Sequence, residues 1–74
     1  MKNQESSHEK FKRLAMLRTN GVISKLRTLT KLSNPRQYHY NKDDMDKIFK
    51  AIHNDLKICK AMFEKNLIKE KFEL

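Results

Sequence analysis

The chain contains a single proline, Pro35, which divides it into two long stretches that each suit a helix. Proline lacks a backbone N–H and its ring clashes with the preceding turn, so a helix interior rarely tolerates it. The residue before it, Asn34, is pushed out of the helical region, which predicts that a first helix ends here. The sequence holds only one glycine, so the tight turns of strand hairpins have almost no material. These features predict an all-α fold.

The stretch before Pro35 predicts an amphipathic helix over about residues 7–32. Ser6 and Glu9 have the spacing of a capping box, in which the serine hydroxyl accepts from the backbone three residues on and the glutamate reaches back. At about 100° per residue, a group of apolar side chains falls within one side of this helix: Phe11, Leu14, Ala15, Val22, Leu26, Leu29 and Leu32. We call this group the apolar sector.

Two residues disturb the pattern of the first helix. Gly21 costs about 1 kcal/mol relative to alanine inside a helix, and Asn20-Gly21 is also a turn signal. A break at Gly21, which would give three helices, is therefore the alternative architecture. Arg18 projects into the middle of the apolar sector, where it would extend to solvent or pair with a carboxylate of the second helix such as Asp55.

The second stretch, over about residues 42–68, has the clearest helical pattern in the sequence. Asn41 is placed to cap its start, and aspartates that follow put negative charge against the positive end of the helix dipole: Asp43, Asp44 and Asp46. Its apolar residues alternate steps of four and three, the spacing of a helix-packing seam: Met45, Ile48, Phe49, Ile52, Leu56, Cys59, Phe63 and Leu67. We call this set the seam.

Together these elements predict an antiparallel two-helix hairpin. Its loop covers residues 33–41, with a flexible tail over residues 1–6 and a fraying end over residues 69–74. A chain of 74 residues forms one domain at most, and a core of this size supplies only a few kcal/mol of net stability. Self-association or a larger assembly is therefore expected to complete the fold.

A second apolar stripe lies about 100° from the seam on the second helix and consists of Ala51, Ile58 and Met62. Met16 and Ile23 form a similar extra strip on the first helix. Two helices cannot cover apolar residues on two faces each, so the stripe is predicted to meet another chain, in a four-helix homodimer or on a larger protein. The alternative is that these are isolated surface residues without consequence.

The charge of the chain is strongly basic and unevenly distributed. The net charge is +8, with a balance of +6 over residues 1–34 and +2 over residues 35–74. Every ionised side chain from Lys10 to Lys31 is basic. Such a field steers acidic partners, which leaves nucleic acid, an acidic protein or an anionic membrane surface as candidates.

The basic residues of the first helix cluster opposite its apolar sector, at Arg13, Arg27 and Lys31. A row of this kind can follow the phosphates of a nucleic acid. The alternative is a solvated helix face with no ligand; because acidic residues are missing from this stretch, the phosphate-binding interpretation stands equal to it.

The predicted loop alternates aromatic with basic and hydrogen-bonding side chains in Arg36-Gln37-Tyr38-His39-Tyr40. Bases of single-stranded RNA commonly stack on such rings beside basic residues, so Arg36 is a further candidate for phosphate contact, and Tyr38 and Tyr40 for stacking. The alternative is that one or both tyrosines fold back over the end of the hairpin core.

The sequence offers no pattern for catalysis, a metal or a cofactor. The histidines His8, His39 and His53 are scattered and lack the spacing of metal ligands. Cys59 lies on the seam about 120° from His53 around the helix, so a buried structural thiol is predicted rather than a nucleophile. No glycine-rich phosphate loop occurs, and so small a chain has no room for a closed pocket. We expect a protein that is not an enzyme.

The single cysteine allows no internal disulfide, which favours a reducing compartment such as the cytoplasm. The longest apolar run has four residues, far short of a membrane span, and a soluble protein is expected.

These observations predict a small basic binding module for nucleic acid, more specifically RNA or a ribonucleoprotein surface. Duplex DNA fits less well, because neither helix offers an obvious set of base-reading side chains near its start. The alternative is an adaptor, inhibitor or regulatory subunit that docks on a larger acidic protein through Ala51, Ile58 and Met62.

Overall fold

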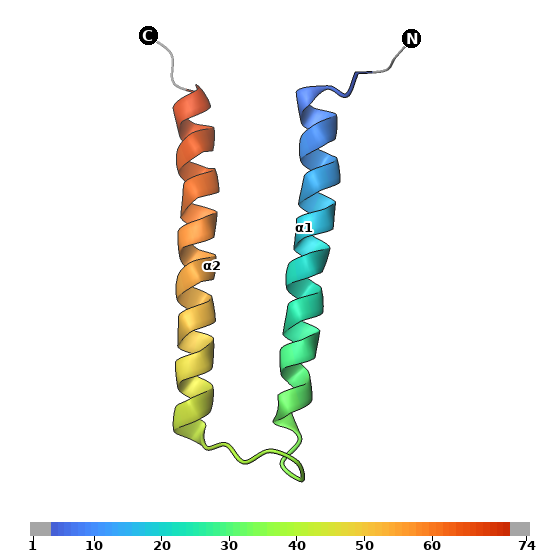
Figure 1. The fold of residues 1–74 in the computed structure, drawn as a ribbon. Helices are drawn as coiled ribbons and strands as arrows, with labels where there is room; N and C mark the ends of the chain where they lie inside the picture. Colours follow the sequence, from blue (N-terminus) through green and yellow to red (C-terminus); the bar gives the residue numbers. More distant parts are fainter. Residues whose placement is uncertain (1–3, 72–74) are drawn as a thin grey trace. The chain divides into compact units, whose positions relative to one another are not determined.

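The computed structural model describes residues 4–71, and it describes the side chains of residues 4–68. This part of the chain is helical and contains no strand, which confirms the prediction of an all-α protein (Figure 1). The helices are α1 (Ser7–Thr30) and α2 (Lys42–Lys71), and a short 3₁₀ turn, η1 (Lys31–Ser33), follows α1 directly. The chain divides after His39 into two units, one containing α1 and the other α2.

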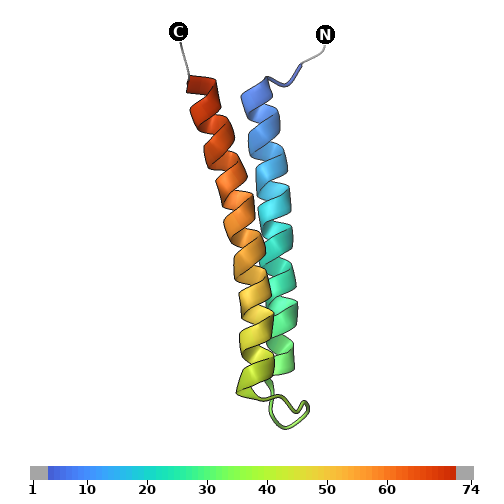
Figure 2. The same cartoon turned by 90° about the vertical axis from the view of Figure 1, so that its left-hand side faces the viewer.

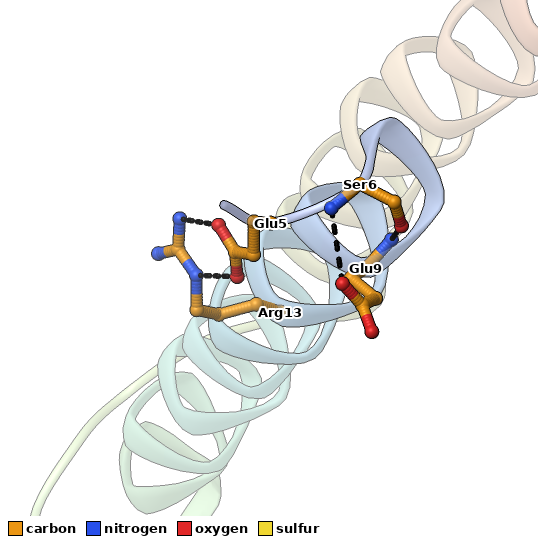
Figure 3. A network of polar contacts seen from close by, with 4 residues as sticks. All are labelled: Glu5, Ser6, Glu9 and Arg13. Carbon is orange, nitrogen blue, oxygen red and sulfur yellow. Dashed lines mark hydrogen bonds and ion pairs between the residues drawn. The ribbon is translucent and has the colours of Figure 1, made fainter. Parts of the chain in front are cut away.

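The start of α1 is fixed by the predicted capping box (Figure 3). Ser6 has extended backbone, with φ −70° and ψ 164°, and its hydroxyl accepts a hydrogen bond of 3.1 Å from the Glu9 backbone N–H. The Glu9 carboxylate accepts in return from the Ser6 N–H at 3.0 Å. These bonds use backbone donors that the first turn of a helix otherwise leaves without a partner. The last residue of the predicted tail, Ser6, is therefore held, whereas residues 1–3 lie outside the described part.

The end of the first helical segment lies where Pro35 predicts it. The α-helix ends at Thr30 and tightens into η1, which extends the segment to Ser33, one residue beyond the predicted boundary. Asn34 then has extended backbone, with φ −72° and ψ 107°. This conformation follows from the steric clash between the proline ring and a helical residue before it.

Gly21 does not break α1. The helix is continuous through this residue, and both views show α1 as one uninterrupted coil (Figures 1 and 2). The alternative with three α-helices is therefore wrong. Gly21 has no positive φ, and a Cβ at this position would meet no atom within 4 Å apart from its chain neighbours and the backbone of its own helix. The helical pattern on both sides of the residue outweighs the propensity cost of a single glycine.

Because the helix neither needs glycine here nor lacks space for a methyl group, we expect Gly21→Ala to stabilise α1 by about 1 kcal/mol. Circular dichroism should show a higher helix content and a higher melting temperature. Asn20→Ala, at the neighbouring position, is a matched control that should give a smaller gain, since asparagine has a lower propensity cost than glycine. A decrease in helix content for Gly21→Ala would contradict this description of the residue.

The start of α2 is closed by a second reciprocal cap. The Asn41 side-chain oxygen accepts from the Asp44 backbone N–H at 2.8 Å, and the Asp44 carboxylate accepts from the Asn41 N–H at 3.2 Å. Lys42 forms an ion pair of 3.0 Å with Asp46, one turn further along. The helix then continues through Lys71, three residues beyond the predicted end. Residues 72–74, the last part of the predicted fraying end, lie outside the described part.

Burial is low along both helices. Within residues 4–68 no side chain is fully buried, and the half-buried ones are Leu14, Ala15, Leu29 and Ile52. All four belong to the apolar sector or the seam. Cys59 is exposed, contrary to the predicted burial, because one helix face cannot cover its own side chains.

No helix among the described residues is both long enough and apolar enough to cross a membrane.

Candidate nucleic-acid interface

The three basic residues predicted on the first helix lie in two separate places. Arg27 is in the last turn of α1 and Lys31 opens η1, four residues later, so the two side chains are about 6 Å apart along the helix axis and share a face. Arg13 lies fourteen residues before Arg27, which corresponds to about 21 Å of helix. The structure therefore brings Arg27 and Lys31 together and sets Arg13 apart.

Arg13 is also engaged by an acidic partner within the chain (Figure 3). Its Nε donates to Oε2 of Glu5 at 2.8 Å, and its Nη2 donates to Oε1 at 3.1 Å. The hydrogen bond from Arg13 holds the pKa of the Glu5 carboxyl below its ordinary value, and the same bond raises the pKa of Arg13. A phosphate would have to displace this carboxylate, so Arg13 is the weakest candidate of the row.

The other basic candidates have no such partner. Within residues 4–68 the side chains of Arg27, Lys31 and Arg36 are exposed and form no ion pair. No aspartate or glutamate occurs between Glu9 and Asp43, so no acidic residue lies near these positions in the sequence. Their charge is available to an external anion, and it adds to the field of the other basic residues of the stretch.

The loop that carries Arg36 and Tyr38 is an ordered turn built around Asn34. The Asn34 side-chain oxygen accepts a hydrogen bond of 3.0 Å from the Arg36 backbone N–H. Its backbone oxygen accepts from the N–H groups of Gln37 at 3.1 Å and Tyr38 at 3.0 Å. We call residues 34–38 the Asn34 turn. One residue therefore fixes the backbone of both candidate ligand-binding positions.

The two tyrosines lie on different sides of the division between the units. Tyr38 closes the Asn34 turn in the unit of α1, and its side chain is 44% exposed. Tyr40 begins the unit of α2, directly before the cap residue Asn41, and is 43% exposed. Only Tyr38 is thus placed with Arg36 by the structure, and neither ring is buried.

The predicted protein-binding stripe lies along the middle of α2. Ile58 is 62% exposed and Met62 is 51% exposed, and Ala51 is exposed two turns before Ile58. Asp55 lies among them at the border with the seam. Over residues 45–67 the stripe borders the seam, and Asp55 is the one acidic residue between them.

Two features of this interface were missed by the sequence analysis. An asparagine before proline is a known starter of turns in which its own side chain accepts from the backbone two residues on, and this signal could have predicted the role of Asn34. The ion pair of Glu5 with Arg13 has no comparable signal. The two residues are eight positions apart, and Glu5 precedes the helix, so the three- and four-residue spacing of helical pairs does not apply.

Comparison of the chain with protein families, with curated proteins and with solved structures finds no match.

Proposed function

We propose that this chain is a small, non-enzymatic nucleic-acid-binding module that favours RNA. The observation that carries the proposal is the placement of three exposed cations, Arg27, Lys31 and Arg36, in one unit with an ordered turn that holds Tyr38; none of the three forms an ion pair within residues 4–68. Cations of this kind contact phosphates, and an aromatic ring beside them stacks on bases. Tyr40 is a second stacking candidate, and Arg13 contributes only when Glu5 releases it.

The distribution of acidic residues favours single-stranded RNA over specific duplex DNA. Recognition helices place their first turns against the DNA, where the helix dipole and side chains meet the phosphates and base edges. Here α1 begins with the acidic cap residue Glu9, and α2 begins with Asp43 and Asp44. These carboxylates repel phosphates, so neither helix start suits the major groove, whereas the basic end of α1 and the Asn34 turn carry no acid.

Fluorescence anisotropy of labelled single-stranded RNA, titrated with the protein at increasing salt, tests the proposal. With phosphate contacts from Arg27, Lys31 and Arg36, log affinity should fall linearly with log salt with a slope of about −2 for a single strand. Duplex DNA of equal length should bind more weakly near physiological salt. Absence of RNA binding, or binding lost entirely before physiological salt, would contradict the proposed function.

We also infer that α1 and α2 pack as an antiparallel hairpin, with the apolar sector against the seam. Support comes from the exposed apolar residues of both helices. Packing the helices together would remove this apolar surface from water, which is favourable. Arg18 lies fifteen residues before the end of η1, and Asp55 lies thirteen residues after the start of α2, so a hairpin would bring both to about the same level. That pairing would give the charge of Arg18, inside the apolar sector, a partner at the border of the seam.

The exposed stripe Ala51, Ile58 and Met62 supports a second candidate function, the binding of another protein chain. A hairpin that covers the seam would leave this stripe on the outside, because it lies about 100° around α2. A second copy, giving a four-helix bundle, or a larger acidic protein would cover it. Binding that depends on Ile58 and Met62, and not on Arg27 and Lys31, would favour this candidate over RNA binding.

A further inference from the structure

We propose that the Asn34 turn is a preformed site for one unpaired RNA nucleotide, with Arg36 on its phosphate, Tyr38 on its base and Asn34 as the positioning residue. This inference rests on the proposed function and names the part of the ligand that the turn recognises. Asn34 touches no ligand in this arrangement; it acts through the two residues whose backbone it holds.

The hydrogen bonds of Asn34 fix the turn at three points. Its side-chain oxygen holds the Arg36 N–H, and its backbone oxygen holds the Gln37 and Tyr38 N–H groups, all at 3.0 to 3.1 Å. Pro35 adds stiffness, since its ring fixes one backbone angle in the same turn. The turn therefore holds the backbone at Arg36 and Tyr38 in one conformation before any ligand arrives.

The chemistry of the two held side chains selects an unpaired nucleotide. The planar guanidinium of Arg36 can donate two parallel hydrogen bonds to a phosphate, and it forms no ion pair among the described residues. The ring of Tyr38, 44% exposed, offers a face to a base. In a duplex both faces of a base are already stacked on its neighbours, so the ring could not reach one without unpairing. The site thus distinguishes a single strand from a duplex, whereas Arg27 and Lys31 respond to phosphate in either.

Preorganisation is the contribution of Asn34. A loop that is already in its bound conformation loses less freedom on binding, which raises affinity without a new contact to the ligand. Of the three hydrogen bonds, only the one to Arg36 is accepted by the side chain, so only this bond can be removed by substitution. The residue can therefore be tested without changing the charge of the chain.

The test compares Asn34→Ala, which removes the side-chain acceptor, with Asn34→Ser, whose hydroxyl can accept in the same kind of turn. Asn54→Ala on α2 is the matched control, because Asn54 is exposed and lies far along the chain from the turn. Each variant is titrated against a single-stranded RNA and against an RNA duplex of the same length, over a range of salt. Circular dichroism confirms that the helix content is unchanged.

We expect Asn34→Ala to bind the single strand about three- to tenfold more weakly, as the loss of one neutral hydrogen bond predicts. Its affinity for the duplex and its salt dependence should equal those of the wild type. Asn34→Ser should restore most of the affinity for the single strand. Asn54→Ala should bind both RNAs as the wild type does. Tyr38→Leu should lose affinity for the single strand and not for the duplex.

The inference is overturned if Asn34→Ala binds the single strand as tightly as the wild type, or if it weakens both ligands equally. In either of these outcomes the wild type still binds RNA and the proposed function stands. If the wild type binds no RNA, both the proposed function and this inference fail.

Discussion

Replacing Arg27 and Lys31 together by glutamate is expected to lower RNA affinity on the order of 100-fold near physiological salt, because two attractive charge contacts become repulsive and each is worth about 1 kcal/mol in water before screening. The slope of log affinity against log salt should fall from about −2 to about −0.7, since one phosphate contact of three remains. Anisotropy titration of labelled RNA measures both quantities.

Lys50→Glu combined with Lys57→Glu is the matched control for this double reversal. Both lysines are exposed on the polar face of α2 and form no ion pair among the described residues, and the change in net charge is the same. We expect this control to weaken binding only slightly, through the overall field. Glutamate near the end of α1 also opposes the helix dipole, so Arg27→Gln with Lys31→Gln should be measured as well. Equal losses for the two pairs of reversals would argue against a defined phosphate-binding face.

The second large effect is expected from Ile52→Asp on the seam. Loss of a packed isoleucine costs about 2 to 5 kcal/mol, and a buried unpaired charge adds to this. A hairpin of this size has only a few kcal/mol of net stability, so the variant should lose its cooperative thermal transition. Ile52 is half-buried in the structure, and the proposed hairpin would cover it with α1. Circular dichroism melting measures the effect.

Ile58→Asp provides the comparison, because it makes the same chemical change on the same helix, about 120° around the axis. Ile58 is 62% exposed and belongs to the stripe outside the proposed hairpin. This variant should retain its melting transition at low concentration and should dissociate any self-associated form, as sedimentation velocity would show. If both variants destabilised the monomer equally, the seam and the stripe would not be distinct surfaces, and the hairpin proposal would be wrong.

The helices and their starts could be predicted from the sequence because their causes are local. The Ser6–Glu9 capping box needs only a spacing of three residues, and the end of the first helix needs only Pro35. The cap on α2 was predicted through Asn41, although the returning hydrogen bond of Asp44 was not. Gly21 shows the limit of single-residue propensities, which the helical pattern on either side outweighs.

The candidate site was predicted less completely, because its geometry depends on the backbone around each residue. Arg13, Arg27 and Lys31 share a helix face by periodicity, but only the structure shows that Glu5 occupies Arg13. Tyr38 and Tyr40 look equivalent in the sequence, whereas the hydrogen bonds of Asn34 hold only Tyr38. The sequence gives the residue types of this candidate site. The hydrogen bonds of the Asn34 turn determine which of these residues have a fixed backbone.

The two capping boxes also bear on the order in which the chain folds. Nucleation is the costly step of helix formation, because the first turn fixes the backbone of several residues and gains only one hydrogen bond. Extra hydrogen bonds stabilise the first turn of each helix: those between Ser6 and Glu9 in α1, and those between Asn41 and Asp44 in α2. Each helix therefore has its own nucleation site. Helices form in about 0.1 to 1 μs, well before slower docking steps. During synthesis α1 could therefore be complete while the ribosome is still adding the residues of α2.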